Sequence, residues 1–480
     1  MSEESDVVRR ERFSGGPARD FLSSMAQDRR LFAADLAVDR AHVVMLTEQE
    51  IIEEDSASAV LDALDSVEHA GYDKLDGEDV HAAIETAVIE RVGPEGGRMH
   101  TARSRNDEVA ACIRYRLRED LLDTMEATLA LREALLDRAR EHLGTTMPGY
   151  THRQPAQPTT VAHFLNSYAQ ALARDTDRLL SAYDRTNRSP LGAAAFAGTP
   201  FDIDRERTAE LLGFDSVLRN SMDGVSTRDF LVEAASALST LSITLSGLST
   251  DLVEFASDGY LDLHDDYSST SSIMPQKKNP DTLELVRACA GDASAGLNGL
   301  LTTLKGLPRA YNRDLQEATP HAWAAVDAVT PATEVTAGAV ATATWNEDRL
   351  ATAAGEGFAT ATGVADLLAM SGIPFRTAHE ILALAAETGA DYAAIETAAD
   401  EALDEPLTEY VEREAVEHAL GPEASVASRD SFGGPAPDAV ETALDRAETA
   451  IERDRERLDT RRDWLATAAD ALDEEVSHYA

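Results

Sequence analysis

The longest regular pattern of apolar residues lies between residues 231 and 255. Its apolar positions are separated alternately by three and four residues, the spacing of a heptad seam; they are Leu231, Ala234, Leu238, Leu241, Leu245, Leu248, Leu252 and Phe255. Many of the remaining positions are serine or threonine. We therefore predict a helix surrounded by other helices, most simply at the centre of a bundle of several subunits. An internal helix of a monomer remains the alternative.

Other stretches with helical spacing flank this one. Apolar residues predict a long helix that ends near residue 142, helices over 159–187 and 281–304, and another that begins near 311. Glycine-rich breaks at 93–97 and 355–357 separate this region from shorter helical patterns. We predict an all-α fold in which a long central helical bundle is flanked by two small helical domains. The predicted domains are 1–105, 106–355 and 356–480.

The charge balance narrows the choice of partners. The chain has 87 acidic and 43 basic residues, and its formal net charge is −44. Binding to nucleic acid or to an anionic membrane relies on basic patches, so neither is expected as a partner. Carboxylates on most polar faces indicate a surface suited to high ionic strength, where charge repulsion is screened. An ordinary acidic, solvated surface is the alternative.

The sequence contains no motif for a cofactor or a metal. It has no Walker loop, no GxGxxG opening a βαβ unit and no metal triad, so we expect neither a cofactor nor a bound metal. Cys112 and Cys289 fall inside helical patterns and are expected to be reduced, buried thiols. The first residues lack the apolar core of a signal peptide, and no run of 18 apolar residues occurs. We expect a cytoplasmic protein.

Three polar segments interrupt the helical patterns, at 101–108, 149–157 and 268–281. The first precedes a long helix, so Ser104, Asn106 or Asp107 could simply be its N-cap. The second places His152 in a proline-flanked turn, where a histidine is most often just solvated. The third contains two of the four lysines in the chain and has the composition of a loop, which taken alone could be a flexible linker.

Together the three segments supply a histidine, hydroxyls, amides and cations. This is the inventory needed to hold a polyanionic small molecule and to move a proton. If the helices are long rods, segments at different heights could meet only when neighbouring subunits pack antiparallel. The segments therefore also favour an oligomer.

The motifs around these segments are similar to those of one enzyme superfamily. They are Ser-Arg-Asn-Asp (104–107), Gly-Tyr-Thr-His-x-Gln (149–154), Asn-Ser-Met-Asp-x-Val-Ser-x-Arg-Asp-Phe (220–230), Ser-Ser-Ile-Met-Pro-Gln-Lys-Lys-Asn-Pro-Asp (271–281), Leu-Lys-Gly-Leu-Pro (304–308), Tyr-Asn-x-Asp-Leu-Gln (311–316) and Gly-Ile-Pro-Phe-Arg-x-Ala-His (372–379). In this order they resemble the fumarase/aspartase superfamily, whose members eliminate fumarate from succinyl compounds. The Gln-Lys-Lys in the loop resembles the argininosuccinate lyase family in particular.

The resemblance implies a homotetramer with a central helical bundle and active sites that are each built from three subunits. The implied reaction is a β-elimination that releases arginine and fumarate from argininosuccinate, a step of arginine biosynthesis. Two alternatives remain open: a sister lyase acting on adenylosuccinate or aspartate, and a catalytically silent structural relative. The presence of both His152 and Ser271 weighs against the silent alternative.

The resemblance also implies roles for individual residues. Ser271 matches the catalytic base, and His152 matches the group that assists proton delivery to the leaving nitrogen. Lys277 and Asn279 match holders of the carboxylate that gathers charge, with Glu284 and Ser272 in supporting positions. The remaining matches are substrate contacts: Ser24, Arg105, Asn106, Thr151, Arg228, Tyr311 and Gln316.

Four positions depart from the usual motifs. Thr270 stands in place of a glycine before the two serines, which restricts the loop. Glu108 replaces the usual glutamine after Ser-Arg-Asn-Asp. Arg313 and Thr319 stand where lysines are common, and Thr319 puts one substrate contact in doubt.

Overall fold

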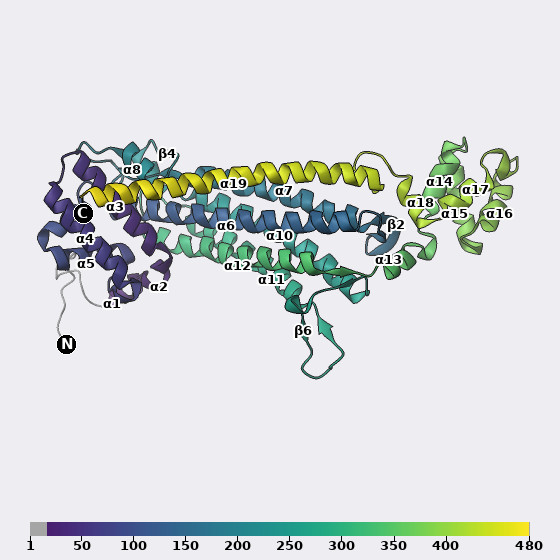
Figure 1. Ribbon diagram of the computed structural model, residues 1–480, viewed down its shortest axis with the longest axis horizontal. Coiled ribbons are helices and arrows are strands. Elements are labelled where there is room, and N and C mark those ends of the chain that lie inside the picture. The colour runs from purple at the N-terminus through teal and green to yellow at the C-terminus, as the bar shows by residue number, and fades with distance from the viewer. Residues whose placement is uncertain (1–16, 480) are drawn as a thin grey trace.

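Long helices run side by side along one axis, with small groups of shorter helices at the two ends (Figure 1). The structure is a computed structural model that describes residues 17–479. Residues 1–16 of the predicted N-terminal domain and residue 480 of the predicted C-terminal domain lie outside the described residues. Within the described range nearly all regular structure is helical, so the prediction of an all-α fold around a long bundle is confirmed.

The bundle consists of helices that reverse direction at each end of the rod. They are α6 (Arg105–Glu141), α7 (Val161–Thr186), α10 (Asp229–Ser257), α11 (Asp281–Leu304) and α12 (Leu315–Thr342). The start of α6 is fixed by a capping box. The Ser104 hydroxyl accepts a hydrogen bond from the Asn106 amide at 3.3 Å, and the Asp107 carboxylate accepts one from the Ser104 amide at 3.0 Å. Ser104 is therefore the N-cap.

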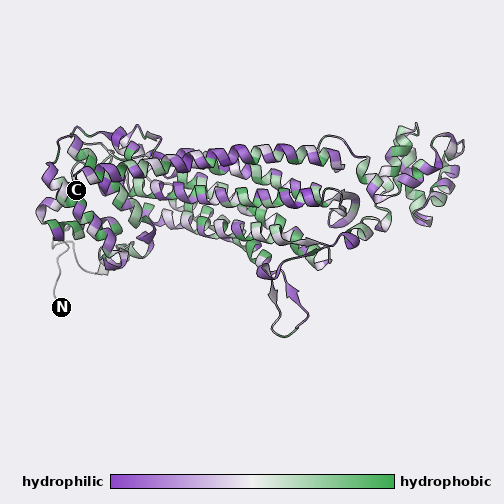
Figure 2. Ribbon diagram, viewed as in Figure 1, coloured by the Kyte–Doolittle hydropathy of each residue, from purple (hydrophilic) through white to green (hydrophobic). Residues whose placement is uncertain are grey.

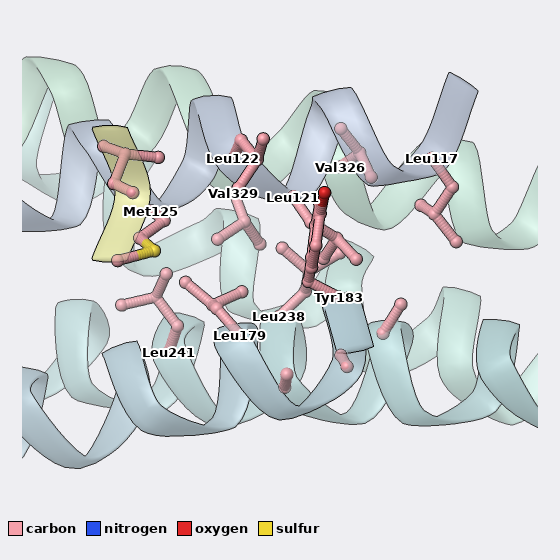
Figure 3. Close-up of a cluster of buried hydrophobic side chains, with 14 of the residues drawn as sticks. Leu117, Leu121, Leu122, Met125, Leu179, Tyr183, Leu238, Leu241, Val326 and Val329 are labelled. Carbon is pink, nitrogen blue, oxygen red and sulfur yellow. The ribbon is translucent and has the colours of Figure 1, made fainter. Parts of the chain in front are cut away.

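The centre of the bundle is a continuous layer of aliphatic side chains. Figure 3 shows residues of α6, α7, α10 and α12 that point toward one another in this layer, among them Leu121, Leu179, Leu238 and Val329. Burying such side chains provides most of the favourable free energy of folding. Along the outside of the rod, the helices carry polar residues on the opposite face (Figure 2).

The heptad seam predicted for residues 231–255 forms α10, and all of its apolar positions are buried. The helix packs against α7, α11 and α12. Its small hydroxyl groups bond to helix carbonyls, as when Ser239 donates to the Ala293 carbonyl of α11 at 3.1 Å. Among the described helices, α10 is long and apolar enough to cross a membrane by composition, but 56% of that apolar window is buried inside the fold. It is the core helix of the bundle.

Short helices form the end of the rod that contains the N-terminal region. They are α1 (Pro17–Leu22), α2 (Met25–Asp28), α3 (Phe32–Glu48), α4 (Glu54–Ala70) and α5 (Val80–Val92), with 3₁₀ turns at Arg29–Leu31, Tyr72–Lys74 and Pro94–His100. Helices α8 (Arg205–Leu211) and α9 (Ser221–Ser226) lie in the connection between α7 and α10. The apolar residues of α3, α4 and α5 join the same core as the bundle.

The opposite end has a separate small core. The helices at this end of the rod are α13 (Glu347–Ala354), α14 (Ala361–Met370), α15 (Phe375–Thr388), α16 (Tyr392–Ala402), α17 (Arg413–Ala419) and α18 (Pro422–Ala427), with 3₁₀ turns at Glu356–Phe358 and Leu407–Glu409. The core runs from Val364 to Val416. Helix α19 (Pro437–Tyr479) returns along α6 and α7 to the other end of the rod (Figure 1). Because α19 contributes to the bundle core, we propose that the third domain ends near residue 430 and not at 480.

Strands are confined to four two-stranded ribbons in the described part of the chain. Strands β1 (Thr146–Thr151) and β2 (Gln154–Thr160) form a hairpin, and β6 (Ser269–Thr270) pairs antiparallel with β7 (Lys278–Asn279). The other two ribbons pair β3 (Arg188–Ser189) with β4 (Ser216–Val217) and β5 (Leu261–Asp262) with β8 (Thr344–Trp345). A 3₁₀ turn at Asp265–Tyr267 precedes β6.

Two ion pairs between α6 and α19 differ in burial and make a matched test of what anchors α19. Arg132 and Asp454 are buried, with 2.8 Å between Nη1 and Oδ2. Asp454→Ala would leave the guanidinium uncompensated, so we expect unfolding to require about 3–5 kcal/mol less. Asp445 pairs with Arg140 at 2.9 Å on the surface. Asp445→Ala should lower the free energy of unfolding by less than about 1 kcal/mol. Urea unfolding of both variants measures the difference. Equal losses in the free energy of unfolding would contradict the role of the buried pair as the anchor of α19.

Candidate active site

The β1–β2 hairpin presents His152 at its tip. Thr151 pairs with Gln154, so the turn has two central residues, His152 and Arg153, with φ of 55° and 59°. Positive φ at both positions is the signature of a type I′ turn, whose twist matches that of the flanking strands. Thr151 and His152 are exposed, and Arg153 forms an ion pair with Glu254 of α10. A tight turn thus presents the histidine to solvent.

The base of the hairpin rests on aromatic side chains. The Tyr150 hydroxyl donates to that of Tyr260 at 3.2 Å, and the Tyr150 ring packs against Phe255 with 6.4 Å between centroids. Burial, together with the hydrogen bond to Tyr260, raises the pKa of Tyr150 well above its usual value. Since Phe255 is the last residue of the α10 seam, the hairpin is tied directly to the core helix.

The loop 268–281 projects from the side of the bundle as a narrow ribbon that carries Ser271 (Figure 1). The Ser271 amide donates to the Lys277 carbonyl at 3.1 Å, which closes the ribbon. The Ser271 oxygen accepts hydrogen bonds from the amides of Ile273 at 3.4 Å and Met274 at 3.0 Å. Two backbone dipoles therefore point at the hydroxyl oxygen, and dipoles in this orientation favour negative charge on it.

The cations of the loop differ in their partners. Lys278 lies 2.9 Å from Asp265 and 3.3 Å from Asp262, and the hydrogen bond to Asp265 raises the pKa of this lysine. Lys277 is exposed and makes no ion pair within residues 17–479. Its ammonium group is available to a ligand. Asn279 follows Lys278 in β7 and pairs with Ser269 of β6.

Three other residues complete the loop and its junction with α11. Thr270 pairs with Lys278 in extended β6, a conformation that suits a β-branched residue and stiffens the ribbon. Ser272 and Glu284 are exposed, and Glu284 lies in the first turn of α11. The predicted supporting residues are therefore near the loop, but no hydrogen bond or ion pair in the described chain joins either of them, or Ser271, to His152.

At the other end of the bundle, four of the predicted substrate contacts line one pocket. They are Ser24, Arg228, Tyr311 and Gln316. The pocket has a volume of about 60 Å³ and lies between α2, the start of α5, α6 and the start of α12. Thr319 also lines it, in the position where a lysine was expected. The pocket is therefore formed by segments that are far apart in the sequence.

Arg228 is the strongest electrostatic feature of this pocket. Its side chain is buried, and Nη1 donates to the Thr227 carbonyl at 2.8 Å, whereas Nε and Nη2 have no hydrogen-bond partner. Burial lowers the pKa of Arg228 to about 10, and burial also raises the pKa of the neighbouring Tyr311. A carboxylate entering the pocket would satisfy the two free donors.

Arg105 and Asn106 lie at the beginning of α6, near this pocket but not among its lining residues. Arg105 is 3.7 Å from both Asp79 and Glu85, distances at which the guanidinium is attracted but not tightly bonded. The Asn106 amide nitrogen donates to the Ala195 carbonyl at 3.0 Å.

The pocket also contains residues that sequence reasoning did not select. Asp28 accepts from the Ser24 hydroxyl at 2.7 Å, and His81 lies beside it in the pocket lining. Asp79 caps α5 by accepting from the Ala82 amide at 2.7 Å. The polar residues at possible helix starts in 21–28 and 78–81 were the available signal, although such residues are more often helix caps than ligands.

The predicted site residues therefore lie in three separate places: the pocket end of the bundle, the hairpin tip and the loop 268–281. Arg105 and Asn106 begin α6, and the hairpin with His152 follows its end after 37 helical residues. At a rise of about 1.5 Å per residue, α6 separates Arg105 from the hairpin by roughly 55 Å. One chain brings Ser24, Arg228, Tyr311 and Gln316 together, but it does not bring them to His152 or Ser271.

The chain is similar to known proteins over nearly its whole length. Residues 18–294 match the family described as Lyase, and residues 358–427 match the family described as Argininosuccinate lyase C-terminal. An argininosuccinate lyase from Natronomonas pharaonis is 70% identical, covering 99% of this chain and 97% of that protein. One from Haloarcula marismortui is 65% identical, covering 98% and 96%. A solved EDDS lyase in complex with formate is 34% identical with a TM-score of 0.88, covering 97% and 96%.

The fold and the motifs define a lyase of the fumarase/aspartase superfamily. Within this class, the chain belongs to the argininosuccinate lyase family. Both levels of the resemblance in the sequence are thereby confirmed.

The hairpin depends on the absence of a side chain at Gly149. A Cβ at this position would lie 2.4 Å from the backbone carbonyl oxygen of Gln157, and backbone cannot move aside cheaply. We expect Gly149→Ala to destabilise the protein by about 1–3 kcal/mol, measured by thermal unfolding. Gly144→Ala is the control, because nothing lies within 4 Å of a Cβ there. If both variants unfold like the wild type, the close contact between Gly149 and Gln157 does not constrain the hairpin.

Proposed function

We propose that this protein cleaves argininosuccinate into arginine and fumarate by β-elimination. The observation that carries the proposal is the Ser271 oxygen, which accepts hydrogen bonds from two backbone amides within the motif that defines the family. The acid–base chemistry of the reaction also needs a group for the leaving nitrogen, and the exposed His152 fits this need. The proposed place of the reaction is arginine biosynthesis in the cytoplasm.

The proposed reaction begins with proton transfer to Ser271. Its alkoxide removes a proton from the carbon next to the one that bears the nitrogen, and the electron pair left behind forms the double bond of fumarate. The carbon–nitrogen bond breaks, and its electrons go to the guanidinium nitrogen of arginine. His152 assists the delivery of a proton to that nitrogen. The balance requires no oxidant and no further reactant.

Ser271 needs help because a serine hydroxyl is a poor base in water. The amides of Ile273 and Met274 stabilise negative charge on its oxygen, and the ammonium of Lys277 carries no competing ion pair within residues 17–479. Ser272 lies beside the base, and Glu284 at the start of α11 supports His152 in the assembled site. Closure of the loop over the substrate would exclude water and strengthen these interactions.

Charge builds on a carboxylate when the proton leaves, so cations and amide donors must lie where this charge appears. We assign that role to Lys277 and Asn279 of the loop. Arg228, with two free donors, binds another carboxylate of the substrate. The remaining proposed substrate contacts are Ser24, Arg105, Asn106, Thr151, Tyr311 and Gln316.

We propose a homotetramer in which each site is built from three subunits. The separation of the pocket, the hairpin and the loop within one chain supports this assembly. The outer face of α11 also supports it, since Leu285 is 68% exposed and Leu301 48% exposed on a helix with few charges. Ile243 of α10 is 64% exposed. In a chain with a net charge of −44, apolar positions of this kind are expected to be covered by other subunits.

Fumarate release from three candidate substrates tests the function. The purified protein should produce fumarate, followed by ultraviolet absorbance, from argininosuccinate and not from adenylosuccinate or aspartate. Release from one of the other substrates would assign the chain to a sister activity. No release from any of them would favour a silent relative.

The base assignment is tested by Ser271→Ala. This variant should lose nearly all activity, by at least about 10³-fold, while its tetramer and its thermal unfolding stay unchanged. Ser268→Ala is the control in the same loop, because its hydroxyl only donates to the His264 carbonyl at 3.0 Å. Substantial turnover by Ser271→Ala would remove Ser271 from the role of base.

The acidic surface generates a prediction about salt. A formal charge of −44 gives strong self-repulsion, which added salt screens. We therefore expect the unfolding temperature to rise between about 0.1 M and about 1 M potassium chloride. An equal osmolality of sucrose is the control for effects of solute exclusion. A lower unfolding temperature in the higher salt would contradict adaptation to high ionic strength.

A further inference from the structure

A cluster of buried charged side chains lies beneath the pocket, where α3, α5 and the start of α6 meet. None of its members belongs to the proposed catalytic machinery. The cluster consists of Asp35 and Asp39 from α3, His81 from α5, Arg103 from the segment before α6, and Glu108 and Cys112 from α6. His81 also lines the pocket that contains Arg228. The cluster therefore borders the proposed substrate site.

The contacts within the cluster are short. Arg103 Nη2 lies 2.6 Å from Asp39 Oδ1 and 3.0 Å from Glu108 Oε1. His81 Nδ1 lies 2.7 Å from Asp35 Oδ1, and the Cys112 thiol donates to the same oxygen at 3.3 Å. Oxygens of Asp35, Asp39 and Glu108 all lie within 4.8 Å of one another. Three carboxyl groups thus lie close together in the buried interior.

The charges do not balance unless one carboxyl group is protonated. Arg103 and protonated His81 supply two positive charges against three carboxylates. A buried negative charge without a partner is energetically costly, and a carboxylate can lose this charge by binding a proton. Glu108 Oε2 has no hydrogen-bond partner, which suits a hydroxyl group able to turn toward Asp39 or Asp35.

The pKa shifts agree with this geometry. Burial raises the pKa of Glu108 well above its usual value, and burial raises the pKa of Asp39 to about 7. Asp35 behaves differently: burial opposes its ionisation, but His81 outweighs burial, and the pKa of Asp35 is lowered. Burial likewise opposes the charge on His81, but Asp35 raises the pKa of His81 to about 10.

We propose that Glu108 is a positioning residue that holds a proton and thereby keeps the pocket end of the active site from carrying an extra negative charge. The inference rests on the proposed function, because it concerns the binding of an anionic substrate. Glu108 lies one turn into α6, and its amide donates to the Ser104 carbonyl at 3.2 Å. Ser104 directly precedes Arg105 and Asn106. The proton on Glu108 is shared with Asp39 across Arg103.

Loss of this proton has two consequences for the site. The new charge repels the carboxylates of the substrate, and burial leaves it poorly screened by salt. It also competes with Asp39 for Arg103, which links α3 to the segment that leads into Arg105. Substrate binding should therefore weaken as pH rises through the titration of the Asp39–Glu108 pair. The chemical step at Ser271 and His152 should change much less.

Glu108→Gln keeps the shape of the side chain and cannot lose a proton. Between pH 7 and pH 9.5, we expect KM of the wild type for argininosuccinate to rise by roughly three- to tenfold more than KM of Glu108→Gln. At each pH, kcat should be similar for the two proteins. Glu126→Gln makes the same change of charge on the exposed surface of α6 and should follow the wild type. An equal rise of KM in Glu108→Gln would overturn the proposal.

A second measurement does not depend on activity. A carboxyl group whose pKa is raised by folding stabilises the folded state at low pH, and this contribution is lost as pH rises through the folded-state pKa. From about pH 5 upward, the wild type should therefore lose stability toward urea relative to Glu108→Gln. If Glu108→Gln does not fold, Asp39→Asn removes one carboxylate of the same pair. This variant should flatten the pH dependence of KM and the pH dependence of stability toward urea.

The two measurements separate failure of this inference from failure of the proposed function. If the wild type does not cleave argininosuccinate, the proposed function fails, and the urea profiles still decide whether Glu108 holds a proton. If the wild type is active but Glu108→Gln leaves both the KM profile and the urea profile unchanged, the positioning role fails.

Discussion

Rigid helix length is the constraint on which the rest of this structure depends. Helix α6 is held straight by a layer of buried aliphatic residues along 37 positions, and it keeps Asn106 and His152 at opposite ends. A long rod cannot bend to bring a histidine at one end to a carboxylate pocket at the other. Antiparallel packing of identical rods solves this problem, because it places the end of one chain beside the beginning of another. In such an assembly, neighbouring subunits would cover the exposed apolar positions of α11 and contact the projecting loop.

The type of basic residue differs between the interior and the surface of the protein. Only four of the 43 basic residues are lysines, and arginines supply buried cations such as Arg103, Arg132 and Arg228. A guanidinium suits burial because it is weakly hydrated and donates in several directions. Lys277 and Lys278 instead lie on the exposed loop, where a compact, mobile charge can meet a ligand. The acidic interior then needs protons as well as arginines to reach neutrality, which explains the raised pKa of Glu108.

The sequence predicted the helices and the family well because both rest on local patterns. The heptad seam of α10 and the Ser104 cap each follow from residues close together in the chain. Grouping of Ser24, Arg228, Tyr311 and Gln316 into one pocket came only from family resemblance, since these residues lie far apart in the sequence. The buried charges around Glu108 were not foreseen, because charge balance depends on which helices meet. The return of α19 along the bundle was missed because its sequence is polar and gives no sign of its partner.

The proposed sharing of the active site between subunits can be tested by mixing two inactive variants. Arg228→Ala removes the pocket arginine, and Ser271→Ala removes the proposed base on the projecting loop. Coexpressed chains with different tags allow mixed tetramers to be purified. If different subunits contribute these residues, mixed tetramers contain some intact sites and recover argininosuccinate cleavage, whereas each variant alone stays inactive. Mixed tetramers of normal size that remain as inactive as the parents would contradict a site built between subunits.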